Sequence, residues 1–216
     1  MAELNGISKD FVNALLRIDG HGCSMLLKTL SAQEEGLVPL EDVVIPALEH
    51  IGLAWEEGRI SLSQVYMAGR ICEKVVGDVL SLERPSLYDR PRLAIGVIGD
   101  YHALGKRMVL SVLRSSGFNL LDYGHGLQPL DLIEKTIRDK VDILLLSCLM
   151  LTSAMHVKGV TAGLKKAGSR TVVVVGGAPF RLAPLLWKEV GAHYMGRNSG
   201  EAVSIVQAIM GNRTWA

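Results

Sequence analysis

An aspartate and a histidine separated by one residue, Asp100 and His102, carry the strongest chemical signal in this sequence. An imidazole nitrogen binds transition metals, and a carboxylate that takes the proton of the second ring nitrogen fixes the tautomer and frees the first nitrogen. Gly105 completes the spacing Asp-x-His-x-x-Gly. Because an Asp-x-His pair by itself is more typical of a solvated turn, the elements on either side decide how it is interpreted.

The flanking residues predict a loop between a strand and a helix. Residues 92–98 contain an apolar, partly β-branched run of strand length, and residues 105–116 have the apolar spacing of a helix. Open α/β sheets bind ligands in loops at the carboxyl ends of their strands. The context therefore favours a binding role for Asp100 and His102.

The chain from residue 92 onward alternates strands and helices, a pattern typical of a parallel sheet covered on both faces. Five such units predict an α/β, flavodoxin-like, doubly wound sheet with strand order 2-1-3-4-5. Functional residues should then follow the first, third and fourth strands. We predict strands near 92–98, 118–123, 142–147, 171–175 and 193–196, and helices near 105–116, 129–139, 156–167, 180–190 and 200–210.

The preceding part of the chain predicts a different architecture. Residues 1–84 show apolar side chains at helical spacing with breaks at glycines, which indicates a small bundle of four helices. Residues 85–91 contain two prolines and are predicted to be a linker. The expected domains are thus a helical bundle (1–84), a linker (85–91) and a sheet domain (92–216).

Composition excludes some classes of function. The 216 residues carry a formal net charge of +1, which favours neither nucleic acid nor an anionic membrane surface. No signal peptide or apolar run long enough to span a bilayer is recognised. Cys23, Cys72 and Cys148 lack metal-ligand spacing, so we expect them to be reduced and buried. These features predict a cytoplasmic protein.

Small and polar residues gather after two other predicted strands. Hydroxyl groups between Ser147 and Ser153 could hydrogen-bond Asp100 or the polar edge of a ligand. Gly176 and Gly177 would let a bulky ligand approach the backbone. Each segment alone is better explained by a helix cap or a turn. Their joint position at neighbouring strand ends indicates a binding site.

With these segments, the sheet domain resembles the cobalamin-binding domains of methyltransferase systems. That family includes the methanol and methylamine corrinoid proteins and the cobalamin-binding region of methionine synthase. The motifs that carry the resemblance are Asp100-x-His102-x-x-Gly105, Ser147-x-Leu149 and Gly176-Gly177.

The resemblance implies roles for individual residues. His102 would replace the benzimidazole of the cofactor beneath cobalt, Asp100 would hydrogen-bond its other nitrogen, and Ser153 would complete the triad. Leu151 stands where the family commonly has Thr, and Thr152 is placed to substitute for it. The implied cofactor-binding residues are Gly99, Asp100, Tyr101, His102, Ala103, Leu104, Gly105, Ser147, Leu149, Leu151, Thr152, Ser153, Gly176, Gly177, Ala178, Gly196 and Ser199.

The helical part is similar to the cap of these corrinoid proteins, which implies that Trp55 and Tyr66 shield the upper face of the cofactor. Light-sensing cobalamin regulators carry a histidine eleven positions after this tryptophan. Tyr66 occupies that position here, so an upper histidine ligand is not expected. Packing of Trp55 inside the helical bundle is the alternative interpretation.

The leading hypothesis is a corrinoid methyl carrier, a component of a methyltransferase system rather than a complete enzyme. It would bind cobalamin base-off and His-on, as methylcobalamin and cob(I)alamin. Its partners would be a substrate-specific methyltransferase, an acceptor methyltransferase and a reductive activase. His125 is a further candidate at the cofactor edge, whereas no role is expected for His21, His50, His156 and His193.

Other classes remain as alternatives. A cobalamin sensor or storage module would share the binding site without turnover, although no DNA-binding region is recognised. A subunit of an adenosylcobalamin mutase is disfavoured by the helical cap. A receiver domain would need an acidic cluster beside the first strand, and flavin binding would leave the Asp-x-His pair unexplained.

Overall fold

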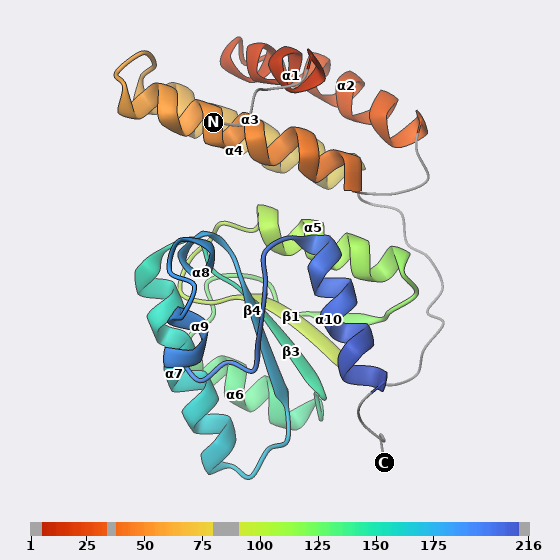
Figure 1. The fold of residues 1–216 in the computed structure, drawn as a ribbon, viewed down its shortest axis with the longest axis vertical. Helices are drawn as coiled ribbons and strands as arrows, with labels where there is room; N and C mark the ends of the chain where they lie inside the picture. Colours follow the sequence, from red (N-terminus) through yellow and green to blue (C-terminus); the bar gives the residue numbers. More distant parts are fainter. Residues whose placement is uncertain (1–5, 34–37, 80–90, 212–216) are drawn as a thin grey trace. The chain divides into compact units, whose positions relative to one another are not determined.

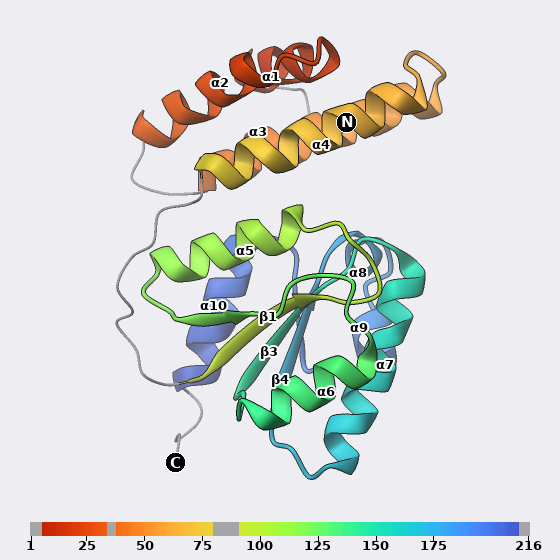
Figure 2. The same cartoon turned by 180° about the vertical axis from the view of Figure 1, so that it is seen from behind.

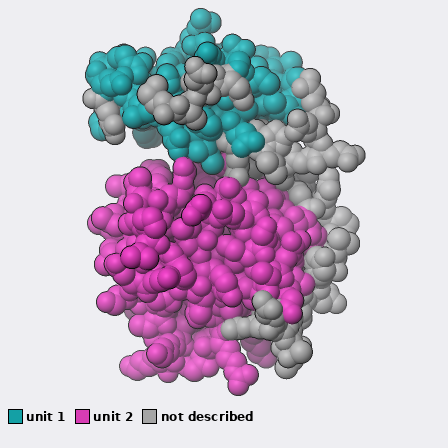
Figure 3. Space-filling model, in the orientation of Figure 1, with its two compact units in different colours: residues 1–82 teal, residues 83–216 magenta. Residues whose placement is uncertain are grey.

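The structure, a computed structural model, describes residues 6–33, 38–79 and 91–211. The chain divides into two compact units, residues 1–82 and 83–216, which are coloured separately in Figure 3. The predicted linker lies outside the described residues except for Pro91. Among the described helices, none combines the length and hydrophobicity needed to cross a membrane.

The first unit consists, in its described part, of four helices, as the sequence predicted. They are α1 (Gly6–Leu16), α2 (Gly20–Gln33), α3 (Val38–Glu56) and α4 (Leu62–Val79). Ser61 caps α4: its hydroxyl accepts from the N–H of Gln64, whose side-chain oxygen accepts from the N–H of Ser61. Phe11, Leu15 and Ile51 are fully or almost fully buried at the centre of the bundle.

The second unit is built on a five-stranded, all-parallel sheet of order β2-β1-β3-β4-β5, which confirms the predicted topology. The strands are β1 (Leu93–Val97), β2 (Leu120–Asp122), β3 (Ile143–Ser147), β4 (Val172–Gly176) and β5 (Tyr194–Gly196). The central strands are buried along almost their whole length, because helices cover both faces.

Alternate residues of each central strand point into two different cores. Leu93, Ile95 and Leu145 pack with α5 (Leu104–Ser115) and α10 (Ser199–Gly211) on one face. Ala94 and Leu144 pack on the other face with α6 (Pro129–Arg138), α7 (Leu151–Lys166), α8 (Ala178–Leu182) and α9 (Leu186–Glu189). Figures 1 and 2 show these two helical layers from opposite sides.

Two predicted helices differ from the structure. Helix α7 begins at Leu151, five residues before the predicted start at 156, because Ser153 and Ala154 continue its buried face. The predicted helix over 180–190 is instead α8 and α9. The break falls at Ala183 (φ −119°, ψ 88°), since the residue before a proline, here Pro184, is driven out of the helical region.

Candidate functional site

Three of the predicted site residues lie side by side in the last row of the sheet. The register pairs Val97 with Ser147, Ser147 with Gly176, and Gly176 with Gly196. A Cβ on Gly176 would stand 3.1 Å from the carbonyl oxygen of Gly196, so these two strand ends approach closely. The row forms a floor of small residues at the carboxyl edge of the sheet.

Asp100 and His102 lie in the loop directly beyond this row. The carboxylate of Asp100 is 7 % exposed, whereas the ring of His102 is 59 % exposed. Oδ1 of Asp100 accepts from the backbone N–H of His102 at 2.9 Å and stands 3.4 Å from Nδ1 of the ring. The carboxylate therefore faces one ring nitrogen, and Nε2 remains for a ligand on the exposed side.

The loop after β3 holds the other oxygen of this carboxylate. The N–H of Leu149 donates to Oδ2 of Asp100 at 3.3 Å. Burial first, and the charge of Asp100 second, raise the pKa of the neighbouring Cys148 thiol. Cys148 therefore stays protonated at neutral pH and is unsuited to nucleophilic or metal-binding chemistry. Like Cys23 and Cys72 it is free and buried, as the sequence predicted.

The loop after β2 supports the main chain of the same segment. The N–H of Gly126 donates to the carbonyl of Asp100 at 2.7 Å. The ring of Tyr101 lies against Gly126, where an added Cβ would come within 2.8 Å of it, and meets the ring of His125 edge-on at 5.4 Å. His125 thus lies beside a predicted site residue.

Ser153 and His156 approach the loop from α7. A Cβ on Gly99 would stand 3.3 Å from Oγ of Ser153 and 3.0 Å from Nδ1 of His156. Both polar atoms therefore converge on the residue before Asp100. Among the described residues, no hydrogen bond joins Ser153 to Asp100, so the triad stays a prediction. His156 was expected to have no role; its spacing of three residues from Ser153 in a helix is the signal that places it there.

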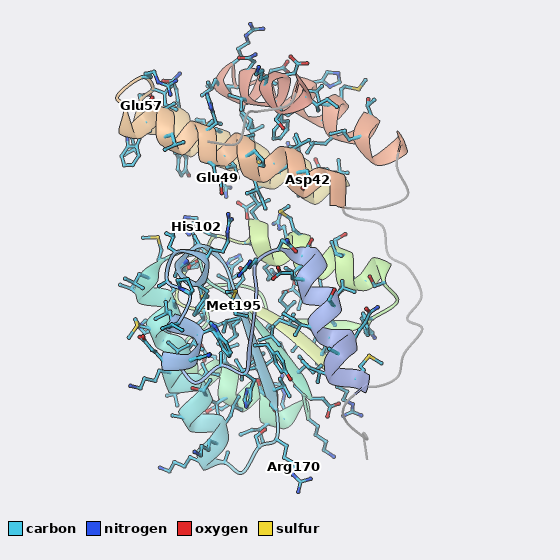
Figure 4. The ribbon with its side chains drawn as sticks, in the orientation of Figure 1. Asp42, Glu49, Glu57, His102, Arg170 and Met195 are labelled. Carbon is cyan, nitrogen blue, oxygen red and sulfur yellow. The ribbon has the colours of Figure 1, made fainter. Side chains whose placement is uncertain are left out.

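Several large apolar side chains are exposed at this edge. Figure 4 shows His102 at one end of the sheet unit and Arg170 at the opposite end. Besides His102, the strand-end loops and the start of α7 expose large apolar side chains to solvent: Tyr101, Leu149, Met150, Leu151 and Met155. An exposed imidazole among apolar side chains suits a large, mostly apolar ligand that carries a metal.

The remaining predicted residues are distributed as follows. Ala103 is buried at the start of α5, and Gly105 stands next to the Ser147 hydroxyl. Ser199 is buried at the first position of α10. Trp55 and Tyr66 belong to the helical unit, where they are 46 % and 65 % exposed. Their exposure places both on the surface of the bundle, which rules out its core for Trp55. Leu104, Thr152 and Ala178 occupy the first turns of α5, α7 and α8.

Comparison with known proteins identifies the ligand class. Residues 93–206 match the family described as B12 binding domain, and residues 7–78 match a second family of the same description. The chain belongs to the B12-binding family. Its resemblance to corrinoid proteins of methyltransferase systems, inferred from the strand-end motifs, is confirmed.

Relatives of this B12-binding protein cover 79 % to 97 % of its length. Dimethylamine corrinoid protein 3 of Methanosarcina acetivorans is 29 % identical and aligns with 97 % of this chain and 100 % of its own. Dimethylamine corrinoid protein 2 of the same organism is 30 % identical over 79 % of this chain and 81 % of its own. The monomethylamine corrinoid protein of Methanosarcina barkeri has the same fold, with a TM-score of 0.78, 24 % identity and coverage of 92 % and 96 %.

The site geometry fits a corrinoid in three respects. A buried carboxylate lies 3.4 Å from one nitrogen of an exposed imidazole, whose other nitrogen could serve as a ligand to a metal. The floor of Ser147, Gly176 and Gly196 offers backbone and small side chains for close approach. The apolar rim described above matches the largely apolar body of a macrocycle. Cobalamin is therefore the cofactor of this B12-binding protein.

Proposed function

We propose that this protein carries a methyl group on its corrinoid between partner methyltransferases, with cobalamin bound base-off and His102 as the lower ligand. The observation that carries the proposal is the exposed His102 ring, held at the carboxyl edge of the sheet by the buried Asp100. The match to dimethylamine corrinoid proteins over almost the whole chain supports it. When bound, cobalamin supplies a cobalt centre that can accept and release a methyl group.

The chain's own contribution is to orient the imidazole and to hold its proton. Asp100 is anchored by the N–H groups of His102 and Leu149, so its carboxylate keeps a fixed direction. With the proton of His102 on Nδ1, facing this carboxylate, Nε2 is unprotonated and free to bind the metal. Ser153 would donate to Asp100 and complete the triad; its buried position beside Gly99 supports this role.

The helical unit is proposed to be the cap of the cofactor. Trp55 and Tyr66 are exposed aromatic side chains on either side of the connection between α3 and α4. Aromatic rings that leave solvent to cover an apolar ligand gain burial energy at low cost in side-chain entropy. We propose that they shield the upper face of the cofactor and move aside when a methyltransferase binds.

The lower ligand is tested by electron paramagnetic resonance of the protein loaded with cobalamin in its Co(II) state. With ¹⁵N-histidine in the protein, we expect hyperfine coupling to one imidazole nitrogen, and we expect His102→Ala to abolish it. His125→Ala is the matched control, because His125 is also exposed at this edge, and it should keep the coupling. Coupling to the cofactor's own benzimidazole nitrogen in the unmutated protein would refute the His-on mode.

The carrier role is tested separately with a ¹³C-methyl label. Loaded protein incubated with methylamine- or methanol-specific methyltransferases should exchange the label with their substrates. A sensor or storage module would give the same ligation signal but no exchange with any of these methyltransferases, which would overturn the carrier proposal and leave the cofactor assignment intact.

A further inference from the structure

Lys106 is a buried cation immediately after the glycine of the Asp-x-His-x-x-Gly motif. Its side chain is only 6 % exposed although it belongs to the first turn of α5. Burial of a lysine is costly unless its charge is paired. Nζ donates to both carboxylate oxygens of Asp122, at 2.6 and 2.7 Å. The sequence motifs gave no role to either residue.

Asp122 connects this pair to the loop after β2. Oδ1 of Asp122 also accepts from the N–H of Gly124 at 2.8 Å, and the carbonyl of Gly124 accepts from the N–H of Val97 at 3.0 Å. Two residues further on, Gly126 donates to the carbonyl of Asp100. The ion pair is thus joined to the main chain of Asp100 through these hydrogen bonds and the covalent chain from Gly124 to Gly126.

From this arrangement we infer that Lys106 is a positioning residue for the metal-binding loop. Its ion pair with Asp122 holds residues 123–127 against residues 97–101, and that loop in turn fixes the main chain on which Asp100 and His102 stand. The functional meaning of this inference rests on the proposed role of His102 as lower ligand. The structural part of the inference does not depend on a cofactor: it says that the ion pair stabilises the hydrogen bond from Gly126 to Asp100.

The alternative is that the ion pair only contributes to overall stability. The pair is only partly buried, since the Lys106 side chain is 6 % and the Asp122 side chain 34 % exposed. Desolvation offsets the attraction in such a pair, whereas removing Asp122 leaves the buried charge of Lys106 unpaired. If the pair positions the loop locally, its loss should increase amide hydrogen exchange in the loop more than in the rest of the unit. A purely global role predicts equal loosening everywhere.

Amide hydrogen exchange of the cofactor-free protein separates these cases. Lys106→Met removes the cation, and Asp122→Asn removes the charge but keeps an oxygen for the N–H of Gly124. We expect both variants to accelerate exchange at Gly126 about tenfold or more relative to the amides of β3 and β4. Arg59→Met is the control, because Arg59 pairs with Glu57 at an exposed position in the helical unit, and it should leave the exchange at Gly126 unchanged.

Two results would overturn the inference: unchanged exchange at Gly126, or acceleration shared equally by the strands. The Asp122→Asn variant keeps the test decisive if Lys106→Met fails to fold. In the cobalamin-loaded variants, the single imidazole coupling expected for unmutated protein should become weaker or heterogeneous. A uniform, unchanged coupling would show that the pair holds the loop without positioning His102, and would also overturn the inference.

Failure of the inference and failure of the proposed function are distinguishable. Benzimidazole coupling in the unmutated protein would reject the His-on proposal whatever the exchange at Gly126. Imidazole coupling that persists together with unchanged Gly126 exchange would reject only the role of Lys106.

Discussion

Replacing Gly177 with alanine is expected to distort the site through the backbone, because the native conformation of Gly177 leaves no room for a Cβ atom. Gly177 adopts φ 115° and ψ 176°, a region that is essentially restricted to glycine. An added Cβ would overlap the carbonyl oxygen of Cys148. The Cys148 N–H also donates to the carbonyl of Gly176 at 3.0 Å, so the two loops cannot separate without breaking this bond.

The free-energy cost of Gly177→Ala is the sum of the backbone strain and the cost of displacing the neighbouring atoms. The backbone conformation costs a residue with a Cβ about 1–3 kcal/mol. Displacing well-packed neighbours costs about 1–3 kcal/mol more, which gives ~2–6 kcal/mol in total for Gly177→Ala. The matched control is Gly168→Ala: Gly168 also has positive φ, 70°, but open space around its Cβ position, so only about 1–2 kcal/mol of backbone cost is expected.

The assay is urea unfolding followed by NMR at resolved amides of residues 91–211, because the two units of the chain need not unfold together. Gly177→Ala should lower the unfolding free energy clearly more than Gly168→Ala. It should also shift the amide resonance of Leu149, whose bond to Asp100 lies next to the displaced carbonyl. Equal destabilisation by the two substitutions, or an unmoved Leu149 amide, would refute the reasoning.

Two further predictions concern the helical unit. Ile18 is a β-branched residue at φ 60°, so Ile18→Gly should stabilise the unit by about 1 kcal/mol and raise its urea midpoint; a lower midpoint would mean that the side-chain contacts of Ile18 outweigh its backbone strain. Burial raises the pKa of Cys23 to about 11 and that of Cys72 to about 12, both from 9.0. Because the folded state keeps these protons longer than the unfolded state, its stability should be complete below about pH 9 and fall as the pH rises towards 11. Cys72→Ala should reduce this slope in unfolding measurements, and a flat profile for the unmutated protein would contradict the assignment.

Several features of this fold are encoded within short stretches of the sequence. The apolar run before Asp100, the alternation of strands and helices, and the positions of the glycines are all visible within short windows. They were sufficient for the strand order, because parallel strands joined by right-handed crossovers allow few topologies. They also placed Asp100, Ser147 and Gly176 at one edge, since every parallel strand ends on the same side of the sheet.

The contacts that fix the site geometry join residues far apart in the chain. The bond from Leu149 to Asp100 spans 49 positions, and the pair of Lys106 with Asp122 spans 16. The residues around each partner do not predict the pair: a lysine in a helix normally points to solvent, and an aspartate at the end of a strand normally faces the following turn. Only the packing of α5 against β2 removes Lys106 from water and thereby makes the pairing necessary.

Within α7, the sequence predicts the body of the helix, whereas only the structure shows where the helix begins. The predicted helix over 156–167 matches the body of α7, but the hydroxyl-bearing segment from Ser147 to Ser153 resembled a strand-end loop in the sequence. In the structure, the N-cap is Met150, and Ser153 is buried against Gly99. The sequence by itself determined the family and the sheet, and it singled out His102 as the proposed metal ligand, because those depend on residue types and periodicity. The tertiary structure decided which N–H groups hold Asp100 and which helix turn reaches Gly99, because those depend on how separate segments pack.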